Sequence, residues 1–228
     1  MDRKIKSVAV PKKQPINLIA TDGIIGEECL DRKSHFICLK GETFGNVSAR
    51  VINYIQKTPR NKELRVLISA GNQDISNENK YIEQNIINGK SENIIKEILE
   101  NFKKEMEILD KEVARVGGRL VIASLIPRPK EQCPNNGINK ERPILLETLS
   151  NLFVKVNQII YEYNKKKGND FPNLKSRCER TGTKRSKTAN DQQQNKIIIS
   201  KFEEVGINLK NSVKSKLMVE CSNHLKFL

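Results

Sequence analysis

The chain has 228 residues, with 41 Lys and Arg against 27 Asp and Glu, and a net charge of +14 at pH 7. This is the length of a single domain that can bury a core. No uncharged apolar run approaches the ~18 residues of a transmembrane helix, and the amino-terminal residues lack the apolar stretch of a signal peptide. We therefore expect an intracellular protein, in the cytoplasm or the nucleus. The five cysteines are widely spaced without a Cys-x-x-Cys pair, which argues against a disulfide framework or a structural zinc site.

Apolar runs that end at turn residues alternate along the chain with apolar residues at helical spacing. In chain order the expected elements are a strand over 16–20, a strand over 35–39, a helix over 47–55, a strand over 64–70, a helix over 91–116, a strand over 119–126, a helix over 144–163, a weaker strand over 197–199 and a helix over about 208–219. Ser91 is the expected N-cap of the second helix, and Gly117 and Gly118 end it. This alternation predicts an α/β fold, a three-layer αβα sandwich of the flavodoxin-like kind, with a parallel sheet covered by helices on both faces.

The carboxyl ends of the expected strands are the expected position of a site, because ligands bind outside these ends in open α/β sheets. The residues found there are Thr21-Asp22-Gly23, Gly41, Gly71-Asn72-Gln73-Asp74 and Pro127-Arg128. Asp74, with Glu78 and Glu83 nearby, could bind a hard cation, but acidic residues after a strand are more often helix caps or solvated charges. The chain has no glycine-rich nucleotide-binding motif. We therefore expect no metal and no cofactor.

The positive charge is concentrated in two segments. Residues 1–14 carry a net charge of +4 and residues 165–187 carry +7, whereas residues 15–164 carry only +1. The basic residues of the second segment are Lys165, Lys166, Lys167, Lys175, Arg177, Arg180, Lys184, Arg185 and Lys187. Gly and Pro interrupt this segment, and its polar continuation lacks apolar periodicity. We therefore expect an exposed basic loop at about 165–195.

Two interpretations of the basic segment stay open. Closely spaced Lys and Arg displace counterions from a nucleic-acid backbone, which favours a phosphate-contacting arm that Arg128 and the basic residues of the N-terminal arm would extend. A solvated linker or a nuclear-targeting segment has the same composition. Tyr161, Tyr163 and Phe171 flank the segment, and we expect the two tyrosines to lie in a helix core rather than in a base-stacking platform.

The strand-end motifs, in this order, resemble those of the SGNH hydrolase family, the GDSL esterases and lipases. Thr21-Asp22-Gly23 stands where the family has Gly-Asp-Ser with its nucleophile, and Gly71-Asn72-Gln73-Asp74 stands where it has Gly-x-Asn-Asp with an oxyanion-hole asparagine. Lys40-Gly41-Glu42-Thr43 is similar to the family's Pro-Gly-x-Thr turn. Val205-Gly206-Ile207-Asn208-Leu209 is similar to the segment that holds the catalytic Asp and His. The resemblance covers about residues 15–220 and implies a three-layer α/β fold.

The catalytic set that the resemblance implies is not preserved. The replacements are Gly23 for the serine, Gln73 for the oxyanion asparagine, Val205 for the acid and Asn208 for the base, and only Gly41 survives. Acyl transfer of this design needs an activated hydroxyl, a base within hydrogen-bond reach and donors directed at the oxyanion. An alignment that uses His224 as the base supplies no nucleophile. The resemblance therefore implies no catalytic residue, and a vestigial cleft formed by Asp22, Gly23, Gly41, Gln73 and Asn208.

Three functions follow as expectations. The first is a catalytically inactive SGNH-like domain that binds nucleic acid, with RNA as the expected class, through the basic arm and loop. In kind it resembles SGNH domains beside mobile-element proteins and the C-terminal domain of the insect germ-plasm protein Oskar, an RNA-binding domain without the catalytic set. The second is an esterase that uses Thr21 or Ser69 as its nucleophile. The third is a protein-interaction scaffold. The expected organisation is an arm over 1–14, the SGNH-like domain over 15–220 and a tail over 221–228.

Overall fold

The computed structural model describes residues 15–25, 34–58, 62–76, 80–126, 142–174, 179–181, 195–197 and 211–227. Its main sheet has four parallel strands in the order β2-β1-β3-β4. These are β1 (Ile16–Thr21), β2 (Ser34–Cys38), β3 (Leu64–Ser69) and β4 (Arg119–Ile122). The parallel sheet and the α/β class expected from the sequence are confirmed.

The two central strands are β1 and β3, and apart from Ile16 at the start of β1 their apolar side chains are buried on both faces of the sheet. Strands buried on both faces read as continuous apolar runs, which is why the sequence revealed them. The register pairs Thr21 at the end of β1 with Cys38 of β2 and with Ser69 of β3. The carboxyl ends of these three strands therefore lie level. We call this side of the sheet the carboxyl edge.

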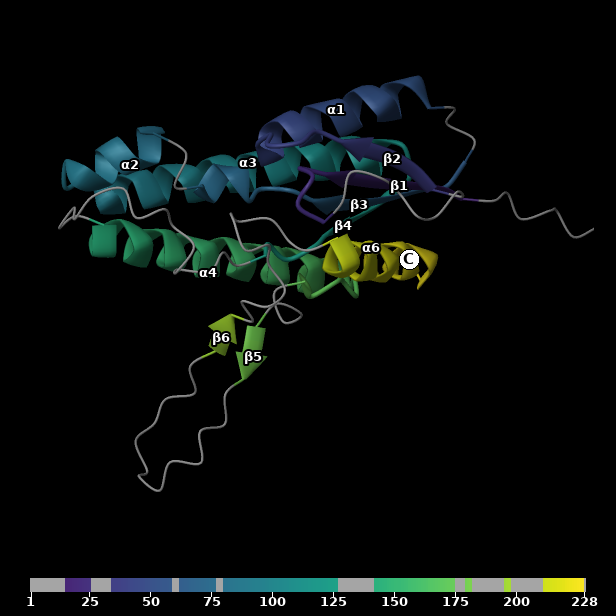
Figure 1. Cartoon of the computed structure of the whole chain (residues 1–228). Helices are drawn as coiled ribbons and strands as arrows, with labels where there is room; N and C mark the ends of the chain where they lie inside the picture. The colour runs from purple at the N-terminus through teal and green to yellow at the C-terminus, as the bar shows by residue number, and fades with distance from the viewer. Residues whose placement is uncertain are drawn as a thin grey trace, which may run out of the picture.

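Helices cover both faces of the sheet, as expected. The helices on one face are α1 (Phe44–Lys57), α3 (Ser91–Arg115) and α4 (Arg142–Lys167), which share a core with Leu18, Val66 and Leu120. Helix α6 (Asn211–Phe227) packs on the other face against Ile19, Leu67 and Val121. Figure 1 shows α1 and α6 on opposite sides of the sheet. Alternate residues of each strand thus supply the two cores, as the two-residue period of a strand requires.

Helix α2 (Lys80–Ile87) was not expected from the sequence. Its buried residues Ile82 and Ile86 pack with Ile94 of α3, away from the main core. The expected N-cap at Ser91 was wrong, because Lys90 is the N-cap residue of α3 and no side chain caps this end. The N–H of Lys90 still closes the end of α2 by bonding the carbonyl of Asn85 (2.8 Å). Gly89, with a φ of +72°, donates to the carbonyl of Ile86 (3.0 Å) in the same turn, so a glycine cap ends α2 directly before α3 begins.

Strand β4 ends four residues earlier than expected, at Ile122. Amide side chains replace the strand ladder beyond it, since Leu125 N–H donates to Asn157 Oδ1 (2.7 Å) and Ile126 N–H donates to Asn72 Oδ1 (3.3 Å). The backbone N–H of Ser124 donates to the carbonyl of Pro172 (3.3 Å) and not to a neighbouring strand. The residues after β4 are thus held by the network at the carboxyl edge.

The C-terminal part of the chain differs most from expectation. Strands β5 (Glu179–Thr181) and β6 (Asn195–Ile197) form a separate antiparallel pair. The expected strand over 197–199 overlaps β6 at Ile197, and its other two residues lie outside the described residues. Residues 221–227, expected as a tail, belong to α6, and Cys221 and Leu225 are buried against the sheet. In the described part of the chain, no helix combines the length and the apolar composition needed to cross a membrane.

Candidate functional site

Asp22 follows β1 at the carboxyl edge and is only 3% exposed. Its carboxylate accepts hydrogen bonds from the backbone N–H of Ile24 (3.2 Å), the backbone N–H of Asn72 (3.2 Å) and the side-chain amide of Asn72 (3.4 Å). Burial raises the pKa of Asp22 above its ordinary value, and these hydrogen bonds oppose the rise. Asp22 is therefore held inside the fold by donors from its own turn and from the turn after β3.

Asn72 extends this network to the residues after β4. Its amide nitrogen donates to Asp22 and its Oδ1 accepts the N–H of Ile126 (3.3 Å). One buried asparagine thus connects the ends of β1, β3 and β4. The resemblance directed attention to Gln73, which lies half-buried in the short helix η1 (Gln73–Ile75). Sequence reasoning placed Asn72 at this strand end but gave it no role, although an amide directly after the glycine that ends a buried strand was a usable signal.

The nucleophile position of the resembled family is occupied by Gly23, whose φ is +90°. L side chains rarely adopt this conformation, and a Cβ there would lie 3.3 Å from the backbone of Lys40. The N–H of Gly23 donates to Thr21 Oγ1 (3.0 Å), and the N–H of Gly41 donates to the carbonyl of Asp22 (3.0 Å). Both groups are used within the fold, so neither is directed at an oxyanion.

The hydroxyl groups at this edge are also engaged or buried. Thr21 is fully buried and accepts the Gly23 N–H, and Ser69 is 3% exposed. Neither hydroxyl has the surface exposure that an attacking nucleophile needs in this conformation. The structure therefore brings Asp22, Gly23 and Gly41 together around internal hydrogen bonds. Asn208 and Val205 lie outside the described residues.

Neither histidine approaches the carboxyl edge. His35 lies exposed near the start of β2, with its ring 5.4 Å from that of Tyr54. His224 lies on α6 with its Nδ1 3.6 Å from the carboxylate of Asp170. The neighbouring carbonyl of Leu225 accepts a hydrogen bond from Arg65 at the start of β3 (3.1 Å). This bond places the end of α6 at the opposite edge of the sheet, so His224 does not serve as a base for a site at the carboxyl edge.

Asp74 holds the start of α1 through a backbone hydrogen bond. Its Oδ2 accepts the N–H of Phe44, the first residue of α1, at 2.7 Å. Burial raises the pKa of Asp74 to about 6, and the charges of Asp22 and Glu105 add to the rise. Among the described residues, no group of three or more His, Cys, Asp or Glu side chains is arranged to hold a metal ion. Glu78 lies outside this part of the chain.

The structure describes residues 165–174 and 179–181 of the basic segment, which begins in the last turn of α4. Lys165, Lys166 and Lys167 are helical and exposed, so the expected loop begins after them. Lys167 donates to the carboxylate of Asp110 at 2.7 Å, whereas Lys165 and Lys166 form no ion pair with a described residue. Arg180 lies in β5. The remaining predicted contacts, which lie outside the described residues, are Arg128, Lys175, Arg177, Lys184, Arg185 and Lys187.

The two tyrosines beside this turn differ in their exposure to solvent. Tyr163 is half-buried and donates to Asp110 Oδ1 (2.7 Å), which agrees with the expected core position. Tyr161 is 46% exposed, so its expected place in a helix core was wrong. Its ring meets Phe171 edge-on at 6.2 Å, and the ammonium of Lys165 lies 5.9 Å from the ring centre. The helical period puts Tyr161 on the outer face of α4, while Ile160 faces the core.

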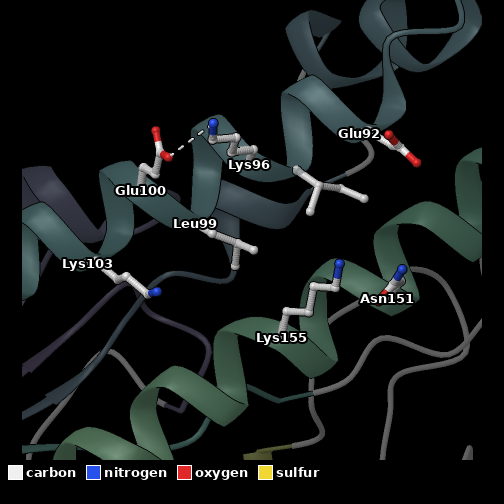
Figure 2. Close-up of a pocket in the computed structure, with 8 residues that line it drawn as sticks. Glu92, Lys96, Leu99, Glu100, Lys103, Asn151 and Lys155 are labelled. Atoms are coloured by element: carbon white, nitrogen blue, oxygen red, sulfur yellow. Dashed lines mark ion pairs between the residues drawn. The ribbon is translucent and has the colours of Figure 1, made fainter.

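A groove of 440 Å³ lies between α3 and α4 (Figure 2). Its apolar residues are Ile95 and Leu99, and Figure 2 shows Lys155 of α4 pointing across toward α3. The polar and charged residues that line it are Glu92, Lys96, Glu100, Lys103, Asn151 and Lys155. The volume is within the range of about 300–1,000 Å³ seen for small-molecule sites. The lining contains no histidine or hydroxyl side chain, so its residues supply neither the nucleophile nor the histidine base of acyl transfer.

The comparisons with known proteins agree with the fold. No protein-family model and no curated protein sequence matches the chain. Among solved structures, the chain is similar to a GDSL-like lipase from Bacteroides thetaiotaomicron, with a TM-score of 0.51 and 11% sequence identity over 98% of this chain and 93% of the lipase chain. At this identity the similarity shows the fold alone. The protein thus has an SGNH-like α/β fold, as the strand-end motifs predicted.

Proposed function

We propose that this protein is an SGNH-like domain that does not hydrolyse esters and that binds RNA through its basic segments. The phosphate-contacting residues are those of the segment 165–187, with the arm over 1–14 and Arg128 as additional contacts. One observation supports the loss of hydrolysis above all others. The nucleophile position holds Gly23 at a φ of +90°, and the polar groups around it are bonded to one another.

Restoring the serine would not restore the chemistry, because the strand-end network has no base in reach. The histidines of the chain are His35 and His224, and both lie away from the carboxyl edge. The N–H of Gly41 is bonded to Asp22 instead of pointing at a substrate oxygen. An SGNH-type reaction would need the serine nucleophile, the histidine base and a free oxyanion donor at the same time.

Binding of nucleic acid is supported by where the charge lies. The segment 165–187 has nine basic and two acidic residues, against a net charge of +1 over the 150 residues before it. At its start, Lys165 and Lys166 are exposed on the last turn of α4. Contacts of this kind with phosphates are electrostatic, weaken with salt and read little sequence.

The test is the affinity of the full chain for a fluorescein-labelled single-stranded RNA, measured by anisotropy over a range of salt concentrations. The triple reversal Lys184→Glu, Arg185→Glu and Lys187→Glu should weaken binding more than tenfold at low salt, and the slope of log affinity against log salt should fall by about 2. The matched control reverses Lys103, Lys104 and Lys111, which are exposed on α3. Equal affinities in the two triple variants, with a flat salt dependence, would contradict the proposal.

The absence of hydrolysis has its own assay. The wild type and the Gly23→Ser variant should both hydrolyse a short-chain nitrophenyl ester no faster than buffer does. Turnover by the wild type that disappears in Thr21→Val or Ser69→Ala would establish the altered esterase instead. This assay is independent of RNA binding, so each half of the proposal can fail alone.

A further inference from the structure

We propose that Tyr161 is a stacking platform for a base of single-stranded RNA. The inference rests on the proposed function and adds to it the strandedness of the RNA. An exposed aromatic face beside positive charge is the arrangement with which proteins hold unpaired bases, since every base has a π-face and the adjoining phosphates need counter-charge.

Tyr161 differs from the other three tyrosines in its surroundings. Tyr54 and Tyr163 are half-buried, and the hydroxyl of Tyr163 donates to Asp110. Tyr81 is 54% exposed, but its hydroxyl donates to Glu97 at 2.9 Å. Tyr161 is 46% exposed, and its hydroxyl bonds no residue in the described part of the chain. Its ring is therefore the exposed aromatic surface that lies beside the basic segment.

The neighbours of Tyr161 orient its ring. Phe171 meets the ring at an interplanar angle of 67°, with a centroid distance of 6.2 Å, so the two rings touch by an edge and do not stack face to face. Lys165 follows one helical turn later and lies on the same side of α4. Its ammonium is 5.9 Å from the ring centre, near the limit of about 6 Å for a cation–π contact. This arrangement leaves Lys165 able to turn from the ring to a phosphate.

Exposed lysines next to the ring supply the counter-charge that the phosphates of a bound RNA need. Lys165 and Lys166 are exposed without an ion pair to a described residue, and the chain continues from them into the rest of the basic segment. Lys167, by contrast, is already paired with Asp110. The basic residues thus follow Tyr161 in the sequence. This order suits a single RNA strand that has one base on the ring and its neighbouring phosphates on the lysines.

The experiment compares Tyr161→Ala with the wild type for a labelled single-stranded RNA and for a duplex of the same length. The alanine variant should lose about tenfold in affinity for the single strand, because a base loses its ring partner. Its affinity for the duplex should stay within about twofold, because paired bases are stacked on each other. Tyr161→Phe should bind like the wild type. Tyr161→Gln also lacks the ring and suits a helix. It should show the same selective loss of single-strand affinity, and it replaces Tyr161→Ala if the alanine variant folds poorly.

Tyr81→Ala is the matched control, since Tyr81 is an exposed tyrosine on α2, away from the basic segment. It should leave both affinities unchanged. Equal losses for single strand and duplex in Tyr161→Ala, or no loss in either, would overturn the stacking inference while the proposed function stands. A wild type that binds neither RNA would overturn both. Binding of a protein partner that survives nuclease and is lost in Tyr161→Ala would assign the ring to a protein interface instead.

Discussion

The carboxyl edge of the sheet and the end of α4 hold polar groups in opposite ways. At the carboxyl edge, Asp22 and Asn72 are buried and bonded to backbone groups of three strand ends. At the end of α4, Lys165 and Lys166 are exposed, with the half-exposed ring of Tyr161 beside them. In the resembled family the first region is the reactive one. In this chain the described polar groups of that region bond one another and the backbone of the strand ends.

The difference indicates where binding can occur. Buried polar groups that satisfy one another stabilise a fold but present nothing to a ligand. Exposed cations contribute little to stability and remain available for a charged partner. Substitutions in the buried network of Asp22 and Asn72 should therefore change the free energy of unfolding and leave RNA affinity alone. Substitutions at the end of α4 should do the reverse.

The largest effect is expected for Gly71→Ala at the carboxyl edge. Gly71 has a φ of +116°, and a Cβ there would lie 2.9 Å from Phe102, whose ring is packed against Phe44. Backbone strain and overpacking together should cost about 3 to 4 kcal/mol in the free energy of unfolding, measured with urea. Gly89→Ala is the control, because it has a φ of +72° but no atom within 4 Å. It should lose only about 1 kcal/mol. Equal losses in both variants would show that packing at Gly71 is unimportant.

A pH-dependent effect is expected at Asp74. Its pKa is raised to about 6 from 3.8, so between these values the folded state binds more protons than the unfolded state and stability falls as pH rises. Asp74→Asn keeps an acceptor for the Phe44 N–H and carries no charge. The variant should match the wild type near pH 4 and exceed it by about 2 to 3 kcal/mol above pH 6. A stability difference that does not vary between pH 4 and 7 would contradict this assignment.

Reversal of the exposed lysines tests the other region. The double variant Lys165→Glu and Lys166→Glu should bind single-stranded RNA about tenfold more weakly at low salt, equivalent to about 1.4 kcal/mol. Its unfolding free energy should fall by less than about 1 kcal/mol, the cost of negative charge at a helix C-terminus. Reversal of Lys103 and Lys104 on α3 is the comparison, and equal losses of affinity would mean that overall charge alone drives binding.

The smallest effect is expected from Asp110→Asn. This change removes the negative charge that holds Lys167 at 2.7 Å, and it keeps an acceptor for Tyr163. A released Lys167 should raise RNA affinity by about threefold at low salt. Glu97→Gln removes the same charge about 20 Å away along α3 and should change nothing. A decrease of affinity in Asp110→Asn would show that the ion pair positions Lys167 for binding.

The sequence predicted the main fold well because the buried strands are largely apolar runs that end at turn residues. It missed α2, since Ile82 and Ile86 are buried by α3 and α4 and not by the main core. It also placed Tyr161 in a helix core, because apolar spacing along α4 does not distinguish Tyr161 from Tyr163. The structure separates them, as Tyr163 bonds Asp110 of α3 and Tyr161 faces outward.

For the candidate site too, some features follow from the sequence alone and others only from the tertiary structure. The glycine at position 23, where the resembled family has its serine, and the concentration of charge over 165–187 are visible in the sequence alone, because they depend only on residue identity. Whether a polar group is available was decided by the tertiary structure. Asp22 meets Asn72 across 50 positions of the chain, and Phe44 meets Asp74 across 30. Hydrogen bonds between groups so far apart in sequence form only when the folded chain brings the strand ends together. Once formed, these bonds occupy the polar groups of Asp22, Asn72 and Asp74 within the fold.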